Sequence, residues 1–326
     1  MTGVTAIVPT WNRRALLERL LGCLARQSQP VEEVLVVDNG SDDGSAEVAE
    51  RAGARVIRMG SNQGFSRAVN RGIRESHTPW LAIVNNDVEP GANWLERLAL
   101  ALQEPDLWFA TGKLLCMDES GSIDGTYDLV SRGACAWRAG RHRKDGPVWS
   151  VARRIQFAPF TAALFRAELF RRVGLLDDGF ESYLEDVDFG LRCALKGYKG
   201  VYVPDAVAYH RGSATLGVWH KDTVQRLARN QVLLVAKHYP RKFLLRYGWP
   251  ILAGQLLWGL VALRHGAGLA CLRGKLEGIR RFRDERAQVR DVPGLGAVLE
   301  ESEREIRALQ KSTGYDLYWR LYFALT

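Results

Sequence analysis

The sequence predicts an α/β fold in which a mostly parallel sheet, flanked by helices, is followed by a helical C-terminal extension. Two observations carry this prediction. Short apolar runs alternate with helical periods over the first part of the chain, and the pattern beyond residue 220 is almost wholly helical. With 326 residues, 47% of them hydrophobic and 25% charged, the chain is long and apolar enough to bury a full core.

Short apolar runs near the N-terminus have the length and the bounding residues of buried strands, and a helical period follows each one. The strands are expected at residues 4–8, 34–37, 55–58 and 80–84, and the helices at residues 14–26, 45–52, 65–75 and 92–102. This alternation gives parallel strands, and such sheets bind ligands at the carboxyl ends of their strands. The polar and glycine residues after each strand are therefore candidates for a site.

The middle of the chain is less regular. Residues 104–160 mix Gly, Asp and aromatic residues with short strand-like pieces, and we expect a loop-rich region there. Further on, the pattern predicts a helix over 167–173, a turn over 174–177, a helix over 185–196 ended by Gly197, and a strand over 198–203. We divide the chain into a binding and catalytic domain, residues 1–220, and a basic amphipathic helical extension, residues 221–326.

The net charge of +8 is concentrated in the rear of the chain. Residues 211–326 hold 20 Lys/Arg against 10 Asp/Glu, and the segment 241–286 holds ten against three. Its most apolar stretch, 249–263, is interrupted by Arg264 and His265 and is shorter than the ~20 residues that span a bilayer. The pattern predicts helices lying on an anionic membrane surface. Nucleic acid is not expected as a partner, because no zinc-finger spacing or RNP-like motif occurs.

The five cysteines are far apart and form no C-x-x-C pair, which favours reduced thiols. The N-terminus runs directly into an apolar strand pattern without a basic and apolar leader. We therefore expect a cytoplasmic protein that is peripheral on the inner face of the cell membrane.

The triplet Asn85-Asn86-Asp87 follows the strand at 80–84 and is a candidate metal site. A strand-end aspartate can hold Mg²⁺ or Mn²⁺ while leaving room for the phosphate oxygens of a diphosphate. The alternative is a turn that Pro90 and Gly91 complete. His210 can supply a further metal ligand, although a lone histidine is more often structural.

Two residues at the ends of earlier strands suit nucleotide binding. Asp38 can accept from a base N–H or a ribose hydroxyl, and Trp11 can stack on a base. The alternatives are a turn at Asp38-Asn39-Gly40-Ser41 and simple packing of the tryptophan.

The run Glu185-Asp186-Val187-Asp188 opens a predicted helix and supplies a candidate general base. An ionised Asp186 at a helix N-terminus can take a proton from a hydroxyl, and Glu185 or Asp188 can orient it. Asp188 can instead pair with Arg192 four residues on, and the acids can simply cap the helix.

Taken together, these segments resemble the inverting family 2 glycosyltransferases of the GT-A fold, in particular the rhamnosyltransferase-like branch. The motifs that carry the resemblance are 8–13 (VPTWNR), 37–45 (VDNGSDDGS), 62–72 (NQGFSRAVNRG), 85–87 (NND), 185–186 (ED), 203–210 (VPDAVAYH), 229–231 (RNQ) and 237–240 (KHYP). Asn85 departs from the D-x-D pattern of the family and leaves a single acidic ligand in the triplet.

The resemblance implies an enzyme that uses a nucleotide-sugar donor and a divalent cation, Mg²⁺ or Mn²⁺. The implied donor-binding residues are Pro9, Thr10, Trp11, Asn12, Asp38, Asn39, Gly64, Phe65, Arg67, Asn85 and Asn86. Asp186 is implied as the base with Glu185 beside it, and Asp87 and His210 as metal ligands. The expected donor is dTDP-L-rhamnose, and the expected acceptor is a hydroxyl of a glycan or lipid-linked glycan, as in cell-wall polysaccharide synthesis.

Other functions fit the residues less well. A dinucleotide oxidoreductase needs G-x-G-x-x-G after the first strand, where this chain has Pro9-Thr10-Trp11-Asn12. A sugar nucleotidyltransferase needs a glycine-rich basic loop at the same place. Two alternatives stay open: a binding protein for nucleotide-sugars or glycans without turnover, and a family 2 transferase that uses another donor such as UDP-galactofuranose.

Overall fold

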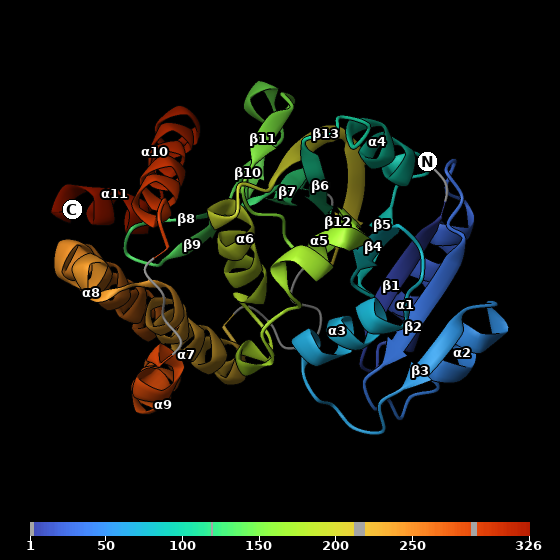
Figure 1. Cartoon of the computed structure of the whole chain (residues 1–326), viewed down its shortest axis with the longest axis horizontal. Coiled ribbons are helices and arrows are strands. Elements are labelled where there is room, and N and C mark those ends of the chain that lie inside the picture. Colours follow the sequence, from blue (N-terminus) through green and yellow to red (C-terminus); the bar gives the residue numbers. More distant parts are fainter. Residues whose placement is uncertain (1–2, 119, 212–218, 288–291) are drawn as a thin grey trace.

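A computed structural model describes residues 3–118, 120–211, 219–287 and 292–326 (Figure 1). The strands are β1 Val4–Thr10, β2 Glu33–Asp38, β3 Arg55–Arg58, β4 Trp80–Val84, β5 Val88–Pro90, β6 Leu107–Cys116, β7 Ser122–Gly125, β8 Asp128–Val130, β9 Ala136–Arg138, β10 Arg143–Lys144, β11 Arg153–Ile155, β12 Ala162–Arg166 and β13 Lys199–His210. The α-helices are α1 Arg14–Ala25, α2 Ser45–Arg51, α3 Phe65–Glu75, α4 Trp94–Ala101, α5 Ala167–Val173, α6 Glu185–Leu195, α7 Lys221–His238, α8 Arg241–Arg264, α9 Gly268–Arg286, α10 Leu295–Thr313 and α11 Leu317–Leu325.

The predicted α/β fold with a helical C-terminal region is confirmed, and the sheet is mixed. Strands β3, β2, β1 and β4 are parallel, as their alternation with helices requires. Strand β12 then lies antiparallel between β4 and β6. Thr10 pairs with Asp38 in the register of β1 and β2, so the carboxyl ends of these strands lie level with each other.

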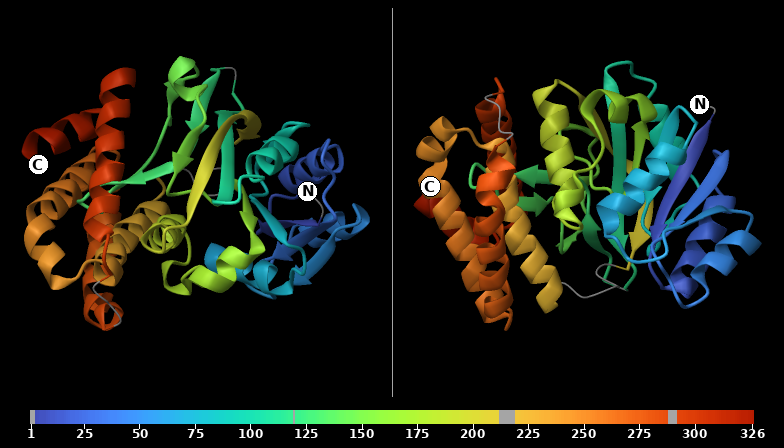
Figure 2. Two further views of the ribbon diagram at one scale, coloured as in Figure 1. Left: turned by 45° about the horizontal axis from the view of Figure 1, so that its top comes forward. Right: turned by 60° about the horizontal axis from the view of Figure 1, so that its bottom comes forward.

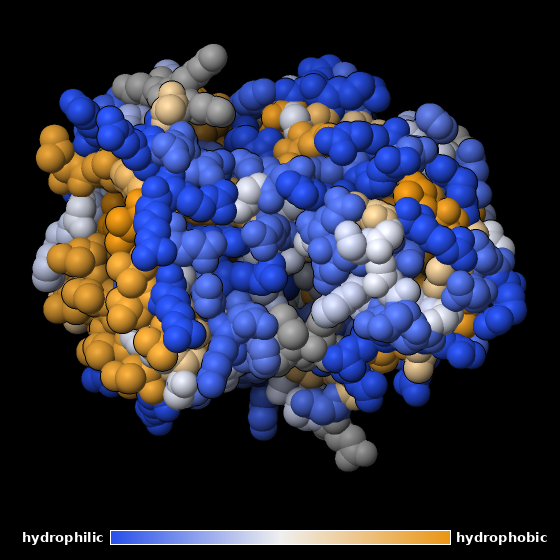
Figure 3. Space-filling view, turned by 90° about the horizontal axis from the view of Figure 1, so that it is seen from below, coloured by the Kyte–Doolittle hydropathy of each residue, from blue (hydrophilic) through white to orange (hydrophobic). Residues whose placement is uncertain are grey.

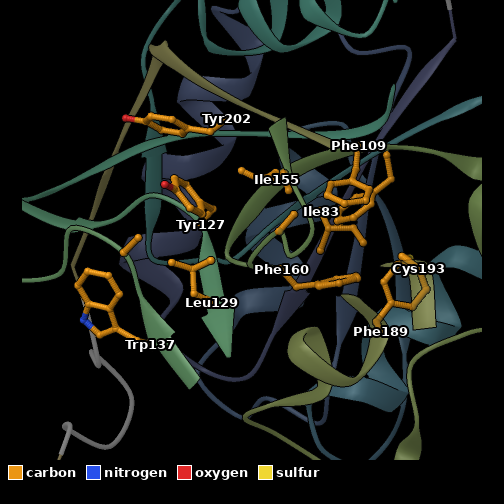
Figure 4. Close-up of a cluster of buried hydrophobic side chains, with 14 of the residues drawn as sticks. Ile83, Phe109, Tyr127, Leu129, Trp137, Ile155, Phe160, Phe189, Cys193 and Tyr202 are labelled. Carbon is orange, nitrogen blue, oxygen red and sulfur yellow. The ribbon is translucent and has the colours of Figure 1, made fainter. Parts of the chain in front are cut away.

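Helices cover both faces of the sheet because successive side chains of a buried strand point to opposite sides. On β1, Val4, Ala6 and Val8 pack with α1 and α4, whereas Ile7 packs with α3 and α6. On the second face, Phe160 stacks on Phe165 with ring centroids 4.8 Å apart, and it meets Phe189 edge to face (Figure 4).

The expectation of a loop-rich region at 104–160 is wrong for its first part. Residues 107–116 form β6, a long strand inside the sheet. Gly112 and Lys113 interrupt its apolar run, and both have a structural cause. A Cβ on Gly112 would lie 1.8 Å from the carbonyl oxygen of Ala206, and the buried Lys113 amine pairs with the exposed Asp145 over 2.8 Å. Strand β13 also extends past the predicted 198–203, through a register shift between Val203 and Val207.

The helical extension packs directly against the rest of the protein (Figure 2). Helix α10 contacts β8 and α6. Leu257, Ile306 and Trp319 belong to the same apolar cluster as the sheet residues Ile83 and Phe109. Residues 212–218, next to the domain boundary expected at residue 220, lie outside the described residues. All five cysteines are free thiols.

We predict that Gly112→Ala destabilises the protein by about 2–3 kcal/mol, because a Cβ at this position overlaps a backbone carbonyl that cannot move without shifting β13. Denaturant unfolding measures the change. Gly248→Ala in α8 is the matched control, because a Cβ there meets nothing within 4 Å. An unfolding free energy that is unchanged in Gly112→Ala would contradict the close approach of β6 and β13.

Candidate active site

Polar side chains at the carboxyl ends of β1 and β4 are joined directly to each other. The Asn86 side-chain amide donates to the Thr10 hydroxyl over 2.8 Å and to the Asn12 carbonyl over 3.2 Å. Asn12 has a positive φ of 58°, which turns its backbone away from the strand direction. Of the donor-binding residues predicted in this segment, Pro9 is buried within β1, and Trp11 is 38% exposed at the end of the strand.

The loop after β2 is organised by its own side chains. Asp38 is buried and accepts from the Ser41 backbone N–H over 3.1 Å, which is the predicted turn. Asn39 reaches the next loop: its amide donates to Asn62 Oδ1 and to the Gly64 carbonyl, and its oxygen accepts from the Gln63 N–H. The loops that follow β2 and β3 are thereby fixed to one another.

The predicted residues Gly64, Phe65 and Arg67 lie at the start of α3. Gly64 has φ 90°, and a Cβ there would lie 3.1 Å from the Glu181 carbonyl oxygen, so this position requires glycine. Phe65 packs against the apolar cluster of the sheet. Arg67 lies 3.4 Å from Asp178 and lines an open hollow of about 630 Å³. The hollow is lined by Asn62, Gln63, Gly64, Arg67, Asp178, Gly179, Glu181, Arg226 and Arg281.

The two predicted metal ligands face each other. His210 Nε2 lies 3.2 Å from Asp87 Oδ1, and His210 Nδ1 lies 2.7 Å from Asp124 Oδ2. Burial lowers the pKa of His210, but the two carboxylates outweigh it and raise that pKa to about 9. Burial alone would raise the pKa of Asp124, whereas its bond to His210 brings it down to about 2.

These residues fit a divalent cation that a bound diphosphate helps to hold. A carboxylate on one imidazole nitrogen orients the other nitrogen toward a metal, which is the arrangement that Asp124 and His210 adopt. Asn85 Oδ1 is buried and makes no hydrogen bond to any described residue, and the buried Asp87 Oδ1 has the His210 imidazole as its neighbour. Within the described ranges, no three His, Cys, Asp or Glu side chains form a complete metal site. In such a site Asp87 and His210 would be the two protein ligands, and a substrate or water would supply the others.

The candidate base Asp186 lies against a guanidinium. Arg138 Nη2 is 3.3 Å from Asp186 Oδ2, and Arg138 Nε is 3.0 Å from Asp128 Oδ1. Burial raises the pKa of Asp186, the charge of Asp128 raises it further, and Arg138 opposes both, which leaves that pKa at about 7. Asp186 is therefore poised between its protonated and ionised forms near neutral pH.

The other acids of this helix start have different surroundings. Burial, and then the charge of Asp186, raise the pKa of Glu185 well above its usual value. Its Oε2 is buried without a hydrogen-bond partner among the described residues. Asp188 pairs with Arg192 over 2.8 Å, as the four-residue spacing predicts, and with His238 over 2.7 Å. Asp188 therefore anchors the helix, and Asp186 is the acid that faces the site.

Arg138 links the candidate base to the candidate metal ligands. Its Nη1 donates to Thr161 Oγ1 over 3.0 Å, and the Thr161 carbonyl accepts from the Asn85 N–H over 2.9 Å. A Cβ on Gly125, next to Asp124, would lie 2.2 Å from Arg138 Cδ. The triplet that contains Asp87 and the acid pair that contains Asp186 are thus two sides of one polar cluster.

Residue-by-residue analysis of the sequence missed Asp124, Asp128, Arg138 and Thr161. The first three come from residues 104–160, where no helical or strand period drew attention to them, and Thr161 follows directly after that range. A weak signal exists, because Asp124, Thr126 and Asp128 are polar at every second position and are all buried. Only the folded chain brings Arg138 to Asp186, which lies 48 residues away.

Comparisons with known proteins agree on one family. The model of "Glycosyl transferase family 2" matches residues 5–174. An N-acetylglucosaminyl-diphospho-decaprenol L-rhamnosyltransferase of Mycobacterium tuberculosis is 30% identical over 267 residues, which cover 70% of this chain and 85% of that protein.

Solved structures of glycosyltransferases share the fold. The mannosyltransferase PcManGT from Pyrobaculum calidifontis, in complex with GDP-Man and Mn²⁺, has a TM-score of 0.53 at 19% identity and covers 98% of this chain and 86% of its own. GalNAc-T7 with UDP, GalNAc and Mn²⁺ has a TM-score of 0.64 at 15% identity and covers 94% of this chain and 58% of its own.

Proposed function

Since the chain belongs to the family 2 glycosyltransferases and has their GT-A fold, we propose that it is an inverting enzyme with Asp186 as its general base. The observation that carries this proposal is the polar cluster in which Arg138 joins Asp186 to the triplet at Asp87. One end of the cluster suits a leaving diphosphate and the other suits a proton acceptor.

The proposed reaction is a single displacement. The acceptor oxygen forms a bond to the anomeric carbon, the bond from that carbon to the diphosphate breaks with its electron pair going to the diphosphate, and the hydroxyl proton passes to Asp186. Arg138 orients the carboxylate and favours its ionised form. Burial and the charge of Asp186 raise the pKa of Glu185, which favours its neutral form beside the base. Attack opposite the leaving group inverts the anomeric configuration.

Asp87 and His210 are the residues that would hold Mg²⁺ or Mn²⁺, with Asp124 orienting the imidazole. A bound cation supplies charge stabilisation to the departing diphosphate. The Mn²⁺ in the two similar structures supports a divalent ion here. The proposed donor site lies between Trp11, the Asp38 turn and Gly64, where Asn39 and Asn86 fix the loops.

The name of the rhamnosyltransferase relative supports L-rhamnose as the sugar and a lipid-linked diphosphate glycan as the acceptor, and the donor that we propose is dTDP-L-rhamnose. Another nucleotide-sugar, such as UDP-galactofuranose, is the competing donor, because single loop hydrogen bonds distinguish such sugars. A lipid-linked acceptor places the enzyme at a membrane, and we propose the inner face of the cell membrane.

The helical extension carries a surface that suits this location. None of the helices in the described ranges is long and apolar enough to cross a bilayer. Leucines on α8 and α9 are nevertheless exposed, and Figure 3 shows apolar side chains gathered at the end of the molecule formed by this extension. The exposed apolar residues are Leu245, Trp249, Leu252, Leu256, Leu260, Leu263, Leu269, Leu272, Leu276 and Ile279. Basic residues such as Arg264, Arg273 and Arg280 are exposed among them, as in helices that lie on anionic lipid.

The Asp186→Asn variant tests the base. We expect kcat to fall about 10²- to 10⁴-fold, because the amide cannot accept the proton, while donor affinity stays near the wild-type value. Steady-state transfer assays and donor binding by calorimetry give the two quantities. A variant that retains wild-type kcat would remove Asp186 from the mechanism.

The pH profile tests the environment of the same carboxylate. Because Asp186 must be ionised, kcat/KM should rise with pH and level off above about pH 7, falling about tenfold per pH unit below it. Asp128→Asn removes a charge that raises this pKa, so the acidic limb should move to lower pH. If the acidic limb of the kcat/KM profile lies at the same pH in Asp128→Asn as in the wild type, the charge of Asp128 does not act on the base.

Chelation tests the metal. Exhaustive EDTA treatment should abolish transfer, and Mn²⁺ or Mg²⁺ should restore it. Asp87→Asn and His210→Gln should raise the metal concentration that gives half-maximal activity, because each removes a ligand. Full activity of the chelated protein would rule the cation out.

Flotation with liposomes tests the membrane surface. The wild-type protein should float with anionic vesicles at low salt, and the double substitution Leu256→Glu, Leu260→Glu should lower the bound fraction about tenfold or more. Leu100→Glu is the matched control, since Leu100 is 57% exposed but lies on α4. Equal flotation of both variants and the wild type would argue against this surface.

A further inference from the structure

The segment just before Asp186 has an unusual backbone. Glu181 has φ 60° and ψ −66°, and the Ser182 N–H donates to the Phe180 carbonyl over 2.7 Å, which together define a γ-turn with positive φ. Such turns are rare and strained. Tyr183 and Leu184 follow with φ of 74° and 66°, also outside the region that L-residues favour. The chain needs outside contacts to keep this conformation.

Helix α7 supplies those contacts from its middle part. The buried Asn230 amide nitrogen lies 2.9 Å from the Phe180 carbonyl, 2.9 Å from that of Ser182 and 2.7 Å from that of Tyr183. The two N–H bonds of this one amide are thus shared among three carbonyls, two of the turn and one of the residue that follows it.

Two arginines on the same face of α7 also bind the turn, mainly through the Glu181 carboxylate. Arg229 Nη2 donates to the Phe180 carbonyl over 2.9 Å, and Arg229 Nη1 lies 3.0 Å from Glu181 Oε1. Arg226 Nη1 lies 2.6 Å from Glu181 Oε2. Spacing of three and four residues puts Arg226, Arg229 and Asn230 on one face of α7.

The turn also contacts the start of α3, where the donor-site motif lies. The Ser66 N–H donates to the Glu181 carbonyl over 2.9 Å, and the Phe65 N–H donates to Ser182 Oγ over 3.3 Å. These two N–H groups belong to the first turn of the helix and have no partner within it. The same short segment thus ends at the candidate base and supports the donor-site loop at Gly64.

We propose that Asn230, together with Arg226 and Arg229, is a positioning residue that locks the strained turn Phe180–Ser182 and thereby sets the donor-site loop and Asp186 relative to each other. This inference rests on the proposed role of Asp186. The helical extension then contributes to catalysis by holding this turn, without contacting the substrate itself.

Hydrogen exchange without any substrate tests the link directly. In Asn230→Ala, the amides of peptides that contain Phe65–Ser66 and Glu181–Leu184 should exchange about tenfold faster than in the wild type. Gln231→Ala is the matched control, because Gln231 is a buried neighbour on the same helix that bonds Lys275 instead of the turn. Exchange that stays at the wild-type rate in Asn230→Ala, or that rises equally in Gln231→Ala, overturns the inference.

Turnover gives the second readout. Asn230→Ala should lower kcat about 100-fold, because small misplacement of a reacting group has effects of this size, while Gln231→Ala keeps kcat within about twofold at a similar loss of melting temperature. Parallel losses of kcat in the two variants would reduce Asn230 to a structural role. A wild-type protein that transfers no sugar would refute the proposed function, and the exchange rates would still decide the link between turn and helix.

Arg226→Ala covers the case in which Asn230→Ala does not fold, because the Arg226 side chain is 37% exposed and its loss leaves no buried cavity. We expect an unchanged melting temperature and a kcat several-fold below the wild type. Arg246→Ala, which removes an exposed arginine paired with Glu300, is its control and should keep full activity. Wild-type kcat in Arg226→Ala contradicts the proposal.

Discussion

The Arg138 guanidinium lies mostly buried between the carboxylates of Asp128 and Asp186 and also donates to Thr161, whose carbonyl holds the triplet after β4. A buried cation of this kind is stable only when carboxylates and hydrogen bonds compensate for its lost hydration. Asp128 and Asp186 therefore fix the position of the Arg138 guanidinium. Arg138 in turn fixes the distance between Asp186 and the triplet after β4. The chemistry that we propose depends on that constraint, because the base and the leaving diphosphate must face opposite sides of one sugar carbon.

The helical extension also helps to hold the segment that carries Asp186 in place. Helix α7 binds the turn before Asp186 through Asn230 and binds α6 again through the contact between His238 and Asp188. Helices α8 and α9 carry exposed leucines, and apolar side chains gather at the end of the molecule that the extension forms (Figure 3). A surface suited to lipid is thus connected, through one helix, to the segment that carries the proposed base.

Local patterns in the sequence predicted most of the regular fold. Strands 55–58 and 80–84 and helices 65–75 and 167–173 have the expected bounds, because each has a clear period and clear ends. Strand β6 was not predicted because Gly112 and Lys113 interrupt its apolar run. The close approach of β13 requires the glycine, and the lysine pairs with Asp145. The family motifs indicated Asp87, Asp186 and His210, and the structure brings them to one cluster. Arg138 could not be predicted, since a single arginine has no local signature and its partners are distant in the chain.

The most direct test of the central claim is a crystal structure of the protein with Mn²⁺ and an unreacted nucleotide-sugar. We expect the cation at Asp87 and His210 with the diphosphate beside it, and the nucleoside beside Trp11 and Asp38. Asp186 should then face the anomeric carbon from the side opposite the diphosphate. A donor bound in the hollow near Arg281, with its anomeric carbon turned away from Asp186, would contradict the account.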